Sequence, residues 1–255
     1  MNRLPVLVFS VVLTMTSGCG VIRNTLPSMD QVIQDAKVSA REPATWLPLA
    51  TAAAIGVTGT DNRITDWAVD ETPIYGSQSR ASKVSDNLRD ALVAGMVLSS
   101  VFAPTGTTDN AFPTRRVTAN ALTFGLIEGI VGTGKVTVRR ERPNNRDDRS
   151  FPSGHSSAAF SSAILIEQNF NATVEKPWLR KSIKAGTYVS AAAVAWARVE
   201  AEEHHPIDVL VSAGLSNFIV KTFYSSIVSG DQDAAAPVGL EVGRQGFLVK
   251  FDHSF

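Results

Sequence analysis

The sequence predicts an all-α protein, a helical bundle of about six core helices with a short C-terminal β-hairpin. Six apolar segments alternate with polar loops along the middle of the chain. In one segment Val84, Leu88, Leu92 and Met96 recur every fourth residue, which places them on one face of a helix. Hydrophobic residues make up 44% of the 255 residues, enough for a substantial core and too many for a disordered chain.

The charge and hydropathy of the chain exclude other classes of protein. The 24 Lys and Arg residues balance the 24 Asp and Glu residues, so no excess of cations is available for a broad nucleic-acid surface. The mean hydropathy of +0.05 argues against a polytopic membrane protein. We therefore expect a mostly soluble protein that binds no nucleic acid.

The first eighteen residues have the layout of a secretory signal peptide. The cation Arg3 precedes an apolar run over residues 4–16, and the small residues Ser17 and Gly18 follow. A short apolar run that ends in small residues is typical of a cleaved export signal. An uncleaved anchor helix is the alternative interpretation of this segment.

Cys19, the only cysteine of the chain, comes directly after this signal. Residues 16–19, which read TSGC, resemble a bacterial lipobox, with Thr16 where Leu is most common. A lone exported thiol has no partner in its own chain, which favours lipidation of Cys19 over an incidental cysteine. By resemblance to sorted lipoproteins, Gly20 favours the periplasmic face of the outer membrane, with the lipid as a membrane anchor.

The elements that follow the signal are expected in this order. Residues 19–43 form a lipidated tether with one short helix near Met29–Ala40, and residues 44–229 form the helical domain. Most uninterrupted apolar stretches in this domain are about 10–14 residues long, as in buried core helices rather than bilayer spans. Segment 44–58 and residues 91–103 are the ones that could touch a membrane. The six predicted core segments are 44–58, 82–103, 117–134, 155–169, 180–198 and 206–228.

The tail over residues 237–255 has a different hydropathy pattern from the helical segments before it. Apolar residues alternate with other residues on both sides of Arg244-Gln245-Gly246, which is the pattern of a hairpin. We expect this hairpin to pack on the bundle. The terminal Phe255 resembles the end of an outer-membrane barrel, but one hairpin cannot close a barrel.

Three polar clusters stand next to these segments. They read KVTVRRERP over 135–143, PSGH over 152–155 and RVEAEEHHPID over 198–208. Each has a plain structural explanation, namely a solvated basic face, a capped helix start, or an i,i+4 pair of His204 and Asp208. Three such clusters in this order make coincidence a poor explanation.

The residue types in these clusters suit phosphoryl transfer. The reacting group spreads negative charge over its oxygens, so the site must supply cations and N–H donors. Lys135, Arg142 and Arg198 can supply the cations, the arginines through forked hydrogen bonds. The backbone N–H groups of Ser153 and Gly154 open a helix, where an anion is favoured.

Taken together, Lys-x6-Arg-Pro, Pro-Ser-Gly-His and Arg-x5-His-x3-Asp resemble the signature of the type 2 phosphatidic acid phosphatase superfamily. That superfamily also includes bacterial class A acid phosphatases and vanadium haloperoxidases. The resemblance covers residues 82–228. This sequence departs from the usual pattern at Ala197, where Ser is common, and at the acidic pair Glu202-Glu203 before His204.

The resemblance implies a role for each site residue. His204 attacks phosphorus to give a phosphohistidine, Asp208 fixes the tautomer of His204, and His155 protonates the leaving oxygen and then activates water. No metal or other cofactor is implied. The substrate is a phosphomonoester or diphosphate, either a small molecule or a lipid phosphate that a tethered enzyme meets at high local concentration.

Four other interpretations were weighed. Residues 129–135 resemble a phosphate-binding loop, but Val136 stands where that loop needs Ser or Thr. A metal site built from His155, His204 and His205 lacks a known ligand spacing, and nearby cations would repel a divalent ion. Two interpretations stay open: a vanadium-dependent haloperoxidase on the same fold, and a structural lipoprotein with a vestigial site.

Overall fold

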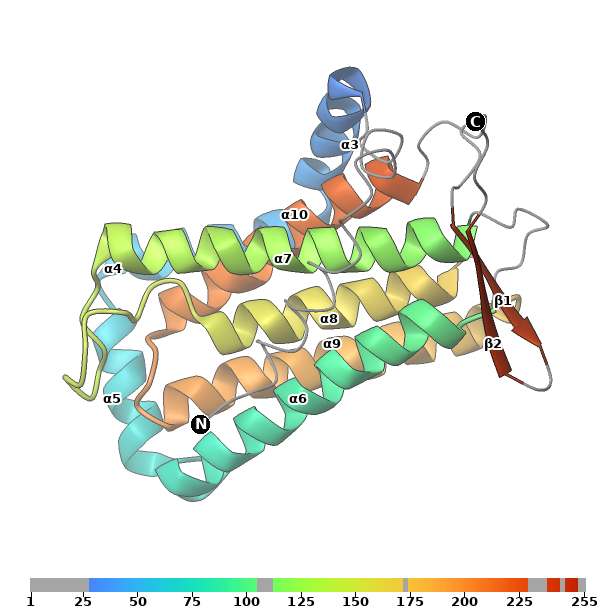
Figure 1. Ribbon diagram of the computed structural model, residues 1–255. Coiled ribbons are helices and arrows are strands. Elements are labelled where there is room, and N and C mark those ends of the chain that lie inside the picture. The colour runs from blue at the N-terminus through green and yellow to red at the C-terminus, as the bar shows by residue number, and fades with distance from the viewer. Residues whose placement is uncertain (1–27, 105–111, 172–173, 229–237, 244–245, 252–255) are drawn as a thin grey trace.

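The computed structural model describes residues 28–104, 112–171, 174–228, 238–243 and 246–251. Within these ranges the chain forms eight helices and one pair of strands (Figure 1). The fold is therefore helical, as the sequence predicts. The elements are α3 (Met29–Arg41), α4 (Pro43–Thr58), α5 (Asp61–Glu71), α6 (Gln78–Phe102), α7 (Phe112–Val138), α8 (Gly154–Asn171), α9 (Pro177–Glu200), α10 (Pro206–Val228), β1 (Val238–Gly243) and β2 (Gly246–Phe251).

Helix α8 is the centre of the bundle and packs against α6, α7, α9 and α10 (Figure 1). Most of its residues are buried, and many of these are serines or alanines. A helix that neighbours cover on all sides loses the one-sided apolar stripe of a surface helix. Small side chains let the surrounding helices approach α8 closely.

The main hydrophobic core joins α8 to its neighbours. Leu92 and Met96 of α6 are buried in this core, and Leu88 is partly buried against it. The four-residue spacing therefore identified the inner face of α6. The core also contains Ile164 and Leu165 of α8.

Helices α3, α4 and α5 form a second group around α10. Helix α4 packs along α10, and the contact is close because residue 214 is glycine. A Cβ atom there would lie 2.6 Å from Leu49 Cγ and 2.7 Å from the Thr45 carbonyl oxygen. Helix α5 contacts α9 and α10, so it reaches the end of the bundle where α10 begins.

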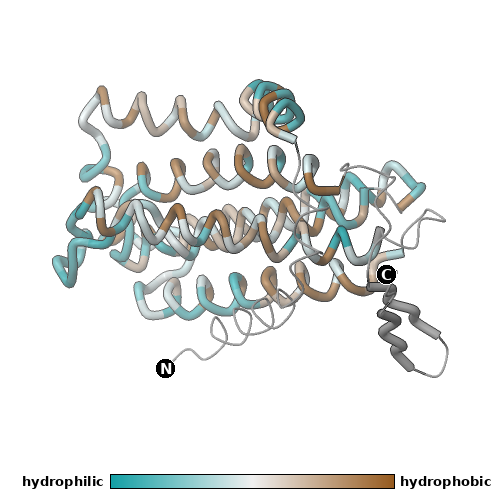
Figure 2. Tube along the Cα trace, turned by 45° about the horizontal axis from the view of Figure 1, so that its top comes forward, coloured by the Kyte–Doolittle hydropathy of each residue, from teal (hydrophilic) through white to brown (hydrophobic). Residues whose placement is uncertain are grey.

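Alternating helix directions bring several helix termini to one end of the bundle. The C-termini of α7 and α9 and the N-termini of α8 and α10 meet there, together with the start of α6 (Figure 1). Hydrophilic residues gather in the loops at the ends of the molecule (Figure 2). All three motif clusters lie at the end where α7 and α9 finish and α8 and α10 begin.

The six predicted core segments correspond to α4 and α6–α10, and the short helix expected near Met29–Ala40 corresponds to α3. The estimate of six helices omits α5, whose sequence is too polar to signal a core helix. In the tail, β1 and β2 pair antiparallel, with Val238 opposite Phe251. The signal peptide over 1–18, Cys19, Gly20 and Phe255 lie outside the described residues.

Two helices in the described ranges are long and apolar enough to cross a membrane by length and composition: Pro113–Val138 and Pro206–Val228. The sequence pattern instead predicts membrane contact for segment 44–58 and residues 91–103. The most apolar window is 61% buried in α10 but only 17% buried in α7. Core packing accounts for the composition of α10 and not for that of α7.

Candidate active site

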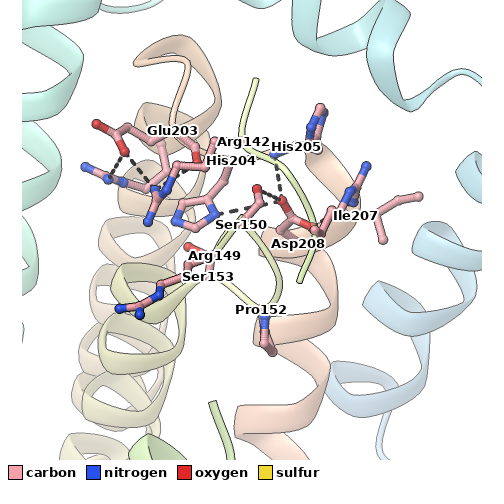
Figure 3. Close-up of polar contacts among 12 residues, drawn as sticks. Arg142, Arg149, Ser150, Pro152, Ser153, Glu203, His204, His205, Ile207 and Asp208 are labelled. Carbon is pink, nitrogen blue, oxygen red and sulfur yellow. Dashed lines mark hydrogen bonds and ion pairs between the residues drawn. The ribbon is translucent and has the colours of Figure 1, made fainter. Parts of the chain in front are cut away.

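The structure brings all eight predicted site residues to one end of the bundle, and Figure 3 labels four of them, Arg142, Ser153, His204 and Asp208. Lys135 lies in the last turn of α7, and Arg142 in the loop that follows. Ser153, Gly154 and His155 lie at the start of α8, while Arg198, His204 and Asp208 lie at the end of α9, in the next turn and at the start of α10.

His204 and Asp208 face each other across the turn between α9 and α10. Both side chains are buried, and His204 is 2% exposed. His204 Nδ1 lies 3.8 Å from Asp208 Oδ2, too long for a hydrogen bond. Within the described residues this nitrogen has no hydrogen-bond partner. If the two side chains approached each other by roughly 0.6–1 Å, His204 Nδ1 and Asp208 Oδ2 would lie within hydrogen-bond distance.

Asp208 is held by three further groups. Its Oδ1 accepts a hydrogen bond of 2.7 Å from Arg140 Nη1, and its Oδ2 accepts from Ser150 Oγ and, at 2.9 Å, from the His205 backbone N–H. Burial alone would raise the pKa of Asp208. The neighbouring His204, Arg140 and Ser150 outweigh burial and lower this pKa to about 2. Asp208 is therefore a fixed anion at neutral pH.

The environment of His204 keeps its imidazole neutral. Burial lowers its pKa to about 4, and the cations Arg198 and Lys135 act in the same direction, against the opposing effect of Asp208. A neutral imidazole has a free lone pair, which a nucleophile requires.

Lys135 ties α7 to the loop before α8. Its Nζ donates to the carbonyl oxygens of Arg149 at 2.9 Å and Pro152 at 2.7 Å. Its side chain also passes Gly154, where an added Cβ would lie 3.7 Å from Lys135 Cε. Burial lowers the pKa of Lys135 to about 8, and nearby Arg142 adds to this effect.

Ser153 is engaged within the protein. Its backbone N–H donates to Ser212 Oγ at 2.9 Å, and its Oγ accepts hydrogen bonds from the backbone N–H and hydroxyl of Ser156. The side chain thus caps α8. The sequence predicts that the Ser153 N–H donates a hydrogen bond to phosphate. In this structure it instead donates to Ser212 and joins the start of α8 to α10.

Arg142 and Arg198 both pair with the Glu203 carboxylate. Arg142 Nε donates to Asp147 at 2.7 Å, and its Nη1 donates to the side chain and main chain of Glu203. Arg198 is 6% exposed and donates to Ser85 Oγ at 3.2 Å. Its Nε is buried and has no hydrogen-bond partner among the described residues, so one donor stays unused.

His155 lies between an acid and a base on α6. Its Nε2 is 2.7 Å from Asp86 Oδ1 and also contacts Arg89 Nη1. Burial lowers the pKa of His155 to about 3, with contributions from Arg198 and Arg89, while Asp86 opposes them. A protonated Nε2 can donate only to Asp86, and a neutral Nε2 can accept from Arg89. The protonation state therefore selects the partner.

Sequence reasoning missed several residues of this site. Arg140 stands inside the first cluster, but nothing distinguished it from its neighbours. Its guanidinium bridges Asp208 to Asp61 of α5, and Asp61 also accepts the Ile207 backbone N–H at 3.0 Å. Asp86 and Arg89 were hidden among the other polar residues of α6. Their position in the sequence, between the apolar residues Val84, Leu88 and Leu92 of α6, could have indicated that they lie close to the buried face of this helix.

The PAP2 superfamily model matches residues 130–229, a range that includes all three motif clusters. A lipid A 1-phosphatase of Porphyromonas gingivalis is 27% identical over 110 residues. That match covers 43% of this chain and 23% of the relative, so the chain spans about a quarter of the relative's length.

Two solved structures are similar. A transmembrane PAP2 type phosphatidylglycerolphosphate phosphatase from Bacillus subtilis has a TM-score of 0.53 at 23% identity, covering 69% of this chain and 89% of that chain. LpxE of Aquifex aeolicus has a TM-score of 0.36 at 22% identity, covering 56% and 93%. The family match agrees with the superfamily resemblance that the motifs predict, and the first structure has a similar fold.

Proposed function

We propose that this protein with the PAP2 fold and motifs is a metal-independent phosphatase that hydrolyses phosphomonoesters or diphosphates through a phosphohistidine. One observation carries the proposal: a buried, neutral His204 lies next to the Asp208 anion and among Lys135, Arg142 and Arg198. This arrangement joins a nucleophile to the charges that a phosphoryl group in transfer needs.

In the proposed reaction, His204 Nε2 attacks phosphorus and the bond from phosphorus to the leaving oxygen breaks. The leaving oxygen takes the proton of His155, and the proton on His204 Nδ1 interacts with Asp208 as positive charge develops on the ring. His155 then takes a proton from water, whose oxygen attacks phosphorus and releases His204 and inorganic phosphate.

The substrate-free pKa of His155 is too low for a general acid at neutral pH. A bound phosphate dianion supplies negative charge next to His155 and offsets the effect of Arg198 and Arg89. This charge raises the pKa of His155 in the complex, where the proton is needed. Asp86 then accepts the hydrogen bond of the protonated ring.

We propose a lipid-linked phosphate as the substrate. The names of the relatives specify lipid A and phosphatidylglycerolphosphate as their substrates. Large apolar side chains are exposed on α4 and α7, and apolar residues far outnumber charged ones in both helices. Such a surface suits contact with lipid. The exposed large apolar residues on these two helices are Trp46, Leu47, Leu49, Val57, Leu126, Val136 and Val138.

We also propose export through the signal over residues 1–18 and lipidation at Cys19, with Gly20 directing the protein to the periplasmic face of the outer membrane. Metabolic labelling with a radioactive fatty acid tests this assignment. Label that is present in the native chain and lost in Cys19→Ser supports the anchor. Label that survives the substitution contradicts it.

The test of the chemistry is hydrolysis of p-nitrophenyl phosphate by the full chain in detergent with EDTA present. We expect turnover that vanadate inhibits and that His204→Ala abolishes. His205→Ala is the matched control, because the His205 ring contacts Thr65 rather than the phosphate-binding cations. Lipid phosphates and diphosphates are assayed alongside, since an enzyme specific for lipid would act on them alone.

Three results would contradict the proposal. Loss of activity in EDTA would point to a metal-dependent reaction. Bromide oxidation with added vanadate and peroxide would move the protein to the haloperoxidase branch. Absence of turnover on every phosphate substrate would favour a structural lipoprotein with a vestigial site.

A further inference from the structure

Glu203 lies in the turn between α9 and α10 (Figure 3) and pairs with three arginines. Its Oε2 is 2.7 Å from Arg142 Nη1 and 3.3 Å from Arg198 Nη2, and its Oε1 is 3.2 Å from Arg146 Nη1. The side chain is 13% exposed. Glu203 is therefore a largely buried anion shared by the arginines of the site.

Two of these arginines, Arg142 and Arg198, bind the phosphate group in the proposed function. A carboxylate and a phosphate offer guanidinium groups the same kind of oxygen acceptor, and both form charge-assisted hydrogen bonds with arginine. Glu203 thus occupies donors that an incoming phosphate requires.

We propose that Glu203 is a built-in counter-anion of the phosphate site, which competes with the substrate phosphate for Arg142 and Arg198 and so sets the affinity for substrate. The inference rests on the proposed phosphate site. It concerns a residue at which this sequence departs from the usual superfamily pattern, so it describes a property of this chain.

The backbone fixes Glu203 in this position. The Glu203 N–H donates to the Arg198 carbonyl oxygen at 3.1 Å, and the Glu203 carbonyl oxygen accepts from Arg142 Nη1 at 3.0 Å. The neighbouring Glu202 has a φ of 60°, which turns the chain sharply after α9. Arg142 thus keeps one contact with residue 203 even when the carboxylate is released.

Arg198 gives independent support. Its Nη2 is paired with Glu203, whereas its buried Nε has no hydrogen-bond partner among the described residues. A buried donor without a partner is costly, and a ligand oxygen would satisfy it. An incoming phosphate can therefore bind Nε first and then displace the carboxylate from Nη2.

A purely structural role for Glu203 predicts the opposite outcome. If Glu203 only positions the arginines, its removal loosens them and weakens phosphate binding. If it competes with phosphate, its removal tightens phosphate binding even though the empty site becomes less stable, because its arginines lose their counter-charge. The sign of the change in affinity separates these roles.

The experiment is isothermal titration of the full chain in detergent with inorganic phosphate, comparing the native protein with Glu203→Gln. We expect the dissociation constant of phosphate to fall by about tenfold or more, since one charge close to the ligand is removed. We also expect Glu203→Gln to melt at a lower temperature without phosphate and to gain more thermal stability from phosphate than the native protein.

Glu202→Gln is the matched control. It removes the same charge one residue away, and Glu202 forms no ion pair with Arg142, Arg146 or Arg198 in the described structure. We expect its dissociation constant for phosphate to change by less than about twofold. Equal tightening in both variants would indicate a general charge effect and overturn the proposal.

Unchanged or weaker phosphate binding in Glu203→Gln also overturns the proposal, even if the native protein is an active phosphatase. If Glu203→Gln does not fold, Glu203→Asp keeps the charge on a shorter side chain and should tighten binding in the same direction by a smaller factor. If neither the native protein nor the variants bind phosphate, both this inference and the proposed phosphate site fail.

Discussion

Three groups donate hydrogen bonds to the Asp208 carboxylate and fix its position beside His204. Ser150 and the His205 backbone N–H fix Oδ2 on the side of His204, while Arg140 neutralises Oδ1. Asp61 holds Arg140 from the other side. The orientation of the proposed catalytic pair, His204 and Asp208, therefore depends on a chain of charges, Asp61–Arg140–Asp208, that starts in α5.

Arg140→Gln tests this chain of charges. The variant removes the cation from Asp208, so we expect the carboxylate to lose its fixed orientation toward His204. A misplacement of this kind costs about tenfold to a hundredfold in kcat/KM. The steady-state rate with p-nitrophenyl phosphate is the measurement, with Arg139→Gln as the control. Arg139 is exposed and makes no ion pair with Asp61 or Asp208, so equal losses in both variants would contradict the assignment.

Lys135 gives the site a pH-dependent affinity for anions. Its pKa is lowered to about 8, so the ammonium loses its proton as the pH rises through about 8. We expect sulfate, whose charge is constant in this range, to bind less tightly at pH 9.5 than at pH 7. In Lys135→Arg this pH dependence should disappear, because guanidinium stays protonated. Titration calorimetry at both pH values measures the effect, and native affinity that is equal at both would refute it.

At the scale of elements, two close approaches position the site. The loop after α7 crosses the N-terminus of α8, where Lys135 binds its carbonyl oxygens. The layer of α3, α4 and α5 packs on α10, the helix that carries Asp208. Gly214 lets α4 lie directly against α10, and Asn217 on α10 donates to Thr45 Oγ1 of α4 at 2.8 Å.

Gly214→Ala tests this contact. The added Cβ would meet Leu49 and the Thr45 carbonyl at less than 3 Å, so we expect the free energy of unfolding to fall by about 1–3 kcal/mol. Gly186→Ala in α9 is the control. No atom lies within 4 Å of that Cβ position, and alanine in an exposed helix is expected to stabilise by about 1 kcal/mol. Denaturant unfolding measures both, and a neutral Gly214→Ala would show that α4 can move away freely.

The sequence predicted elements well where local pattern decides them. The apolar stripe of α6 identified its inner face, and the motif clusters predicted eight site residues that the structure places at one end of the bundle, because both signals lie within short stretches of chain. Arg140 and Asp61 gave no such signal, and Glu203 stood out only as part of an acidic pair, with nothing to indicate its partners. Their roles depend on contacts between segments far apart in sequence, 79 residues for Arg140 with Asp61. Helix α5 was missed for a related reason, since tertiary contacts rather than apolar periodicity support it.

At the scale of the whole molecule, the zero net charge of the chain hides a strong local concentration of charged side chains. The site end of the bundle gathers buried and half-buried cations, carboxylates and two neutral histidines, although the chain has equal numbers of acidic and basic residues. Burial of charge is tolerated there because the charges are paired. The neutral histidines are the exception, and they make the stability of the fold depend on pH.

Acid should therefore destabilise this protein well above the pH at which its carboxylates titrate. The folded-state pKa values of His204 and His155 are lowered to about 4 and about 3, from 6.5, so the unfolded chain binds protons first as the pH falls. Stability is then lost as the pH falls below about 6.5. Asp208, with a folded pKa of about 2, adds a further loss only below about 3.8.

Denaturant unfolding at pH 7 and pH 5 measures this loss. For His204 alone, the pKa difference corresponds to about 2 kcal/mol less free energy of unfolding at pH 5. His204→Gln should remove that share and lose less stability between the two pH values than the native protein. An equal loss in both would assign the effect to other groups. The burial that keeps the His204 imidazole neutral, as the proposed nucleophile requires, therefore also lowers the stability of the protein in acid.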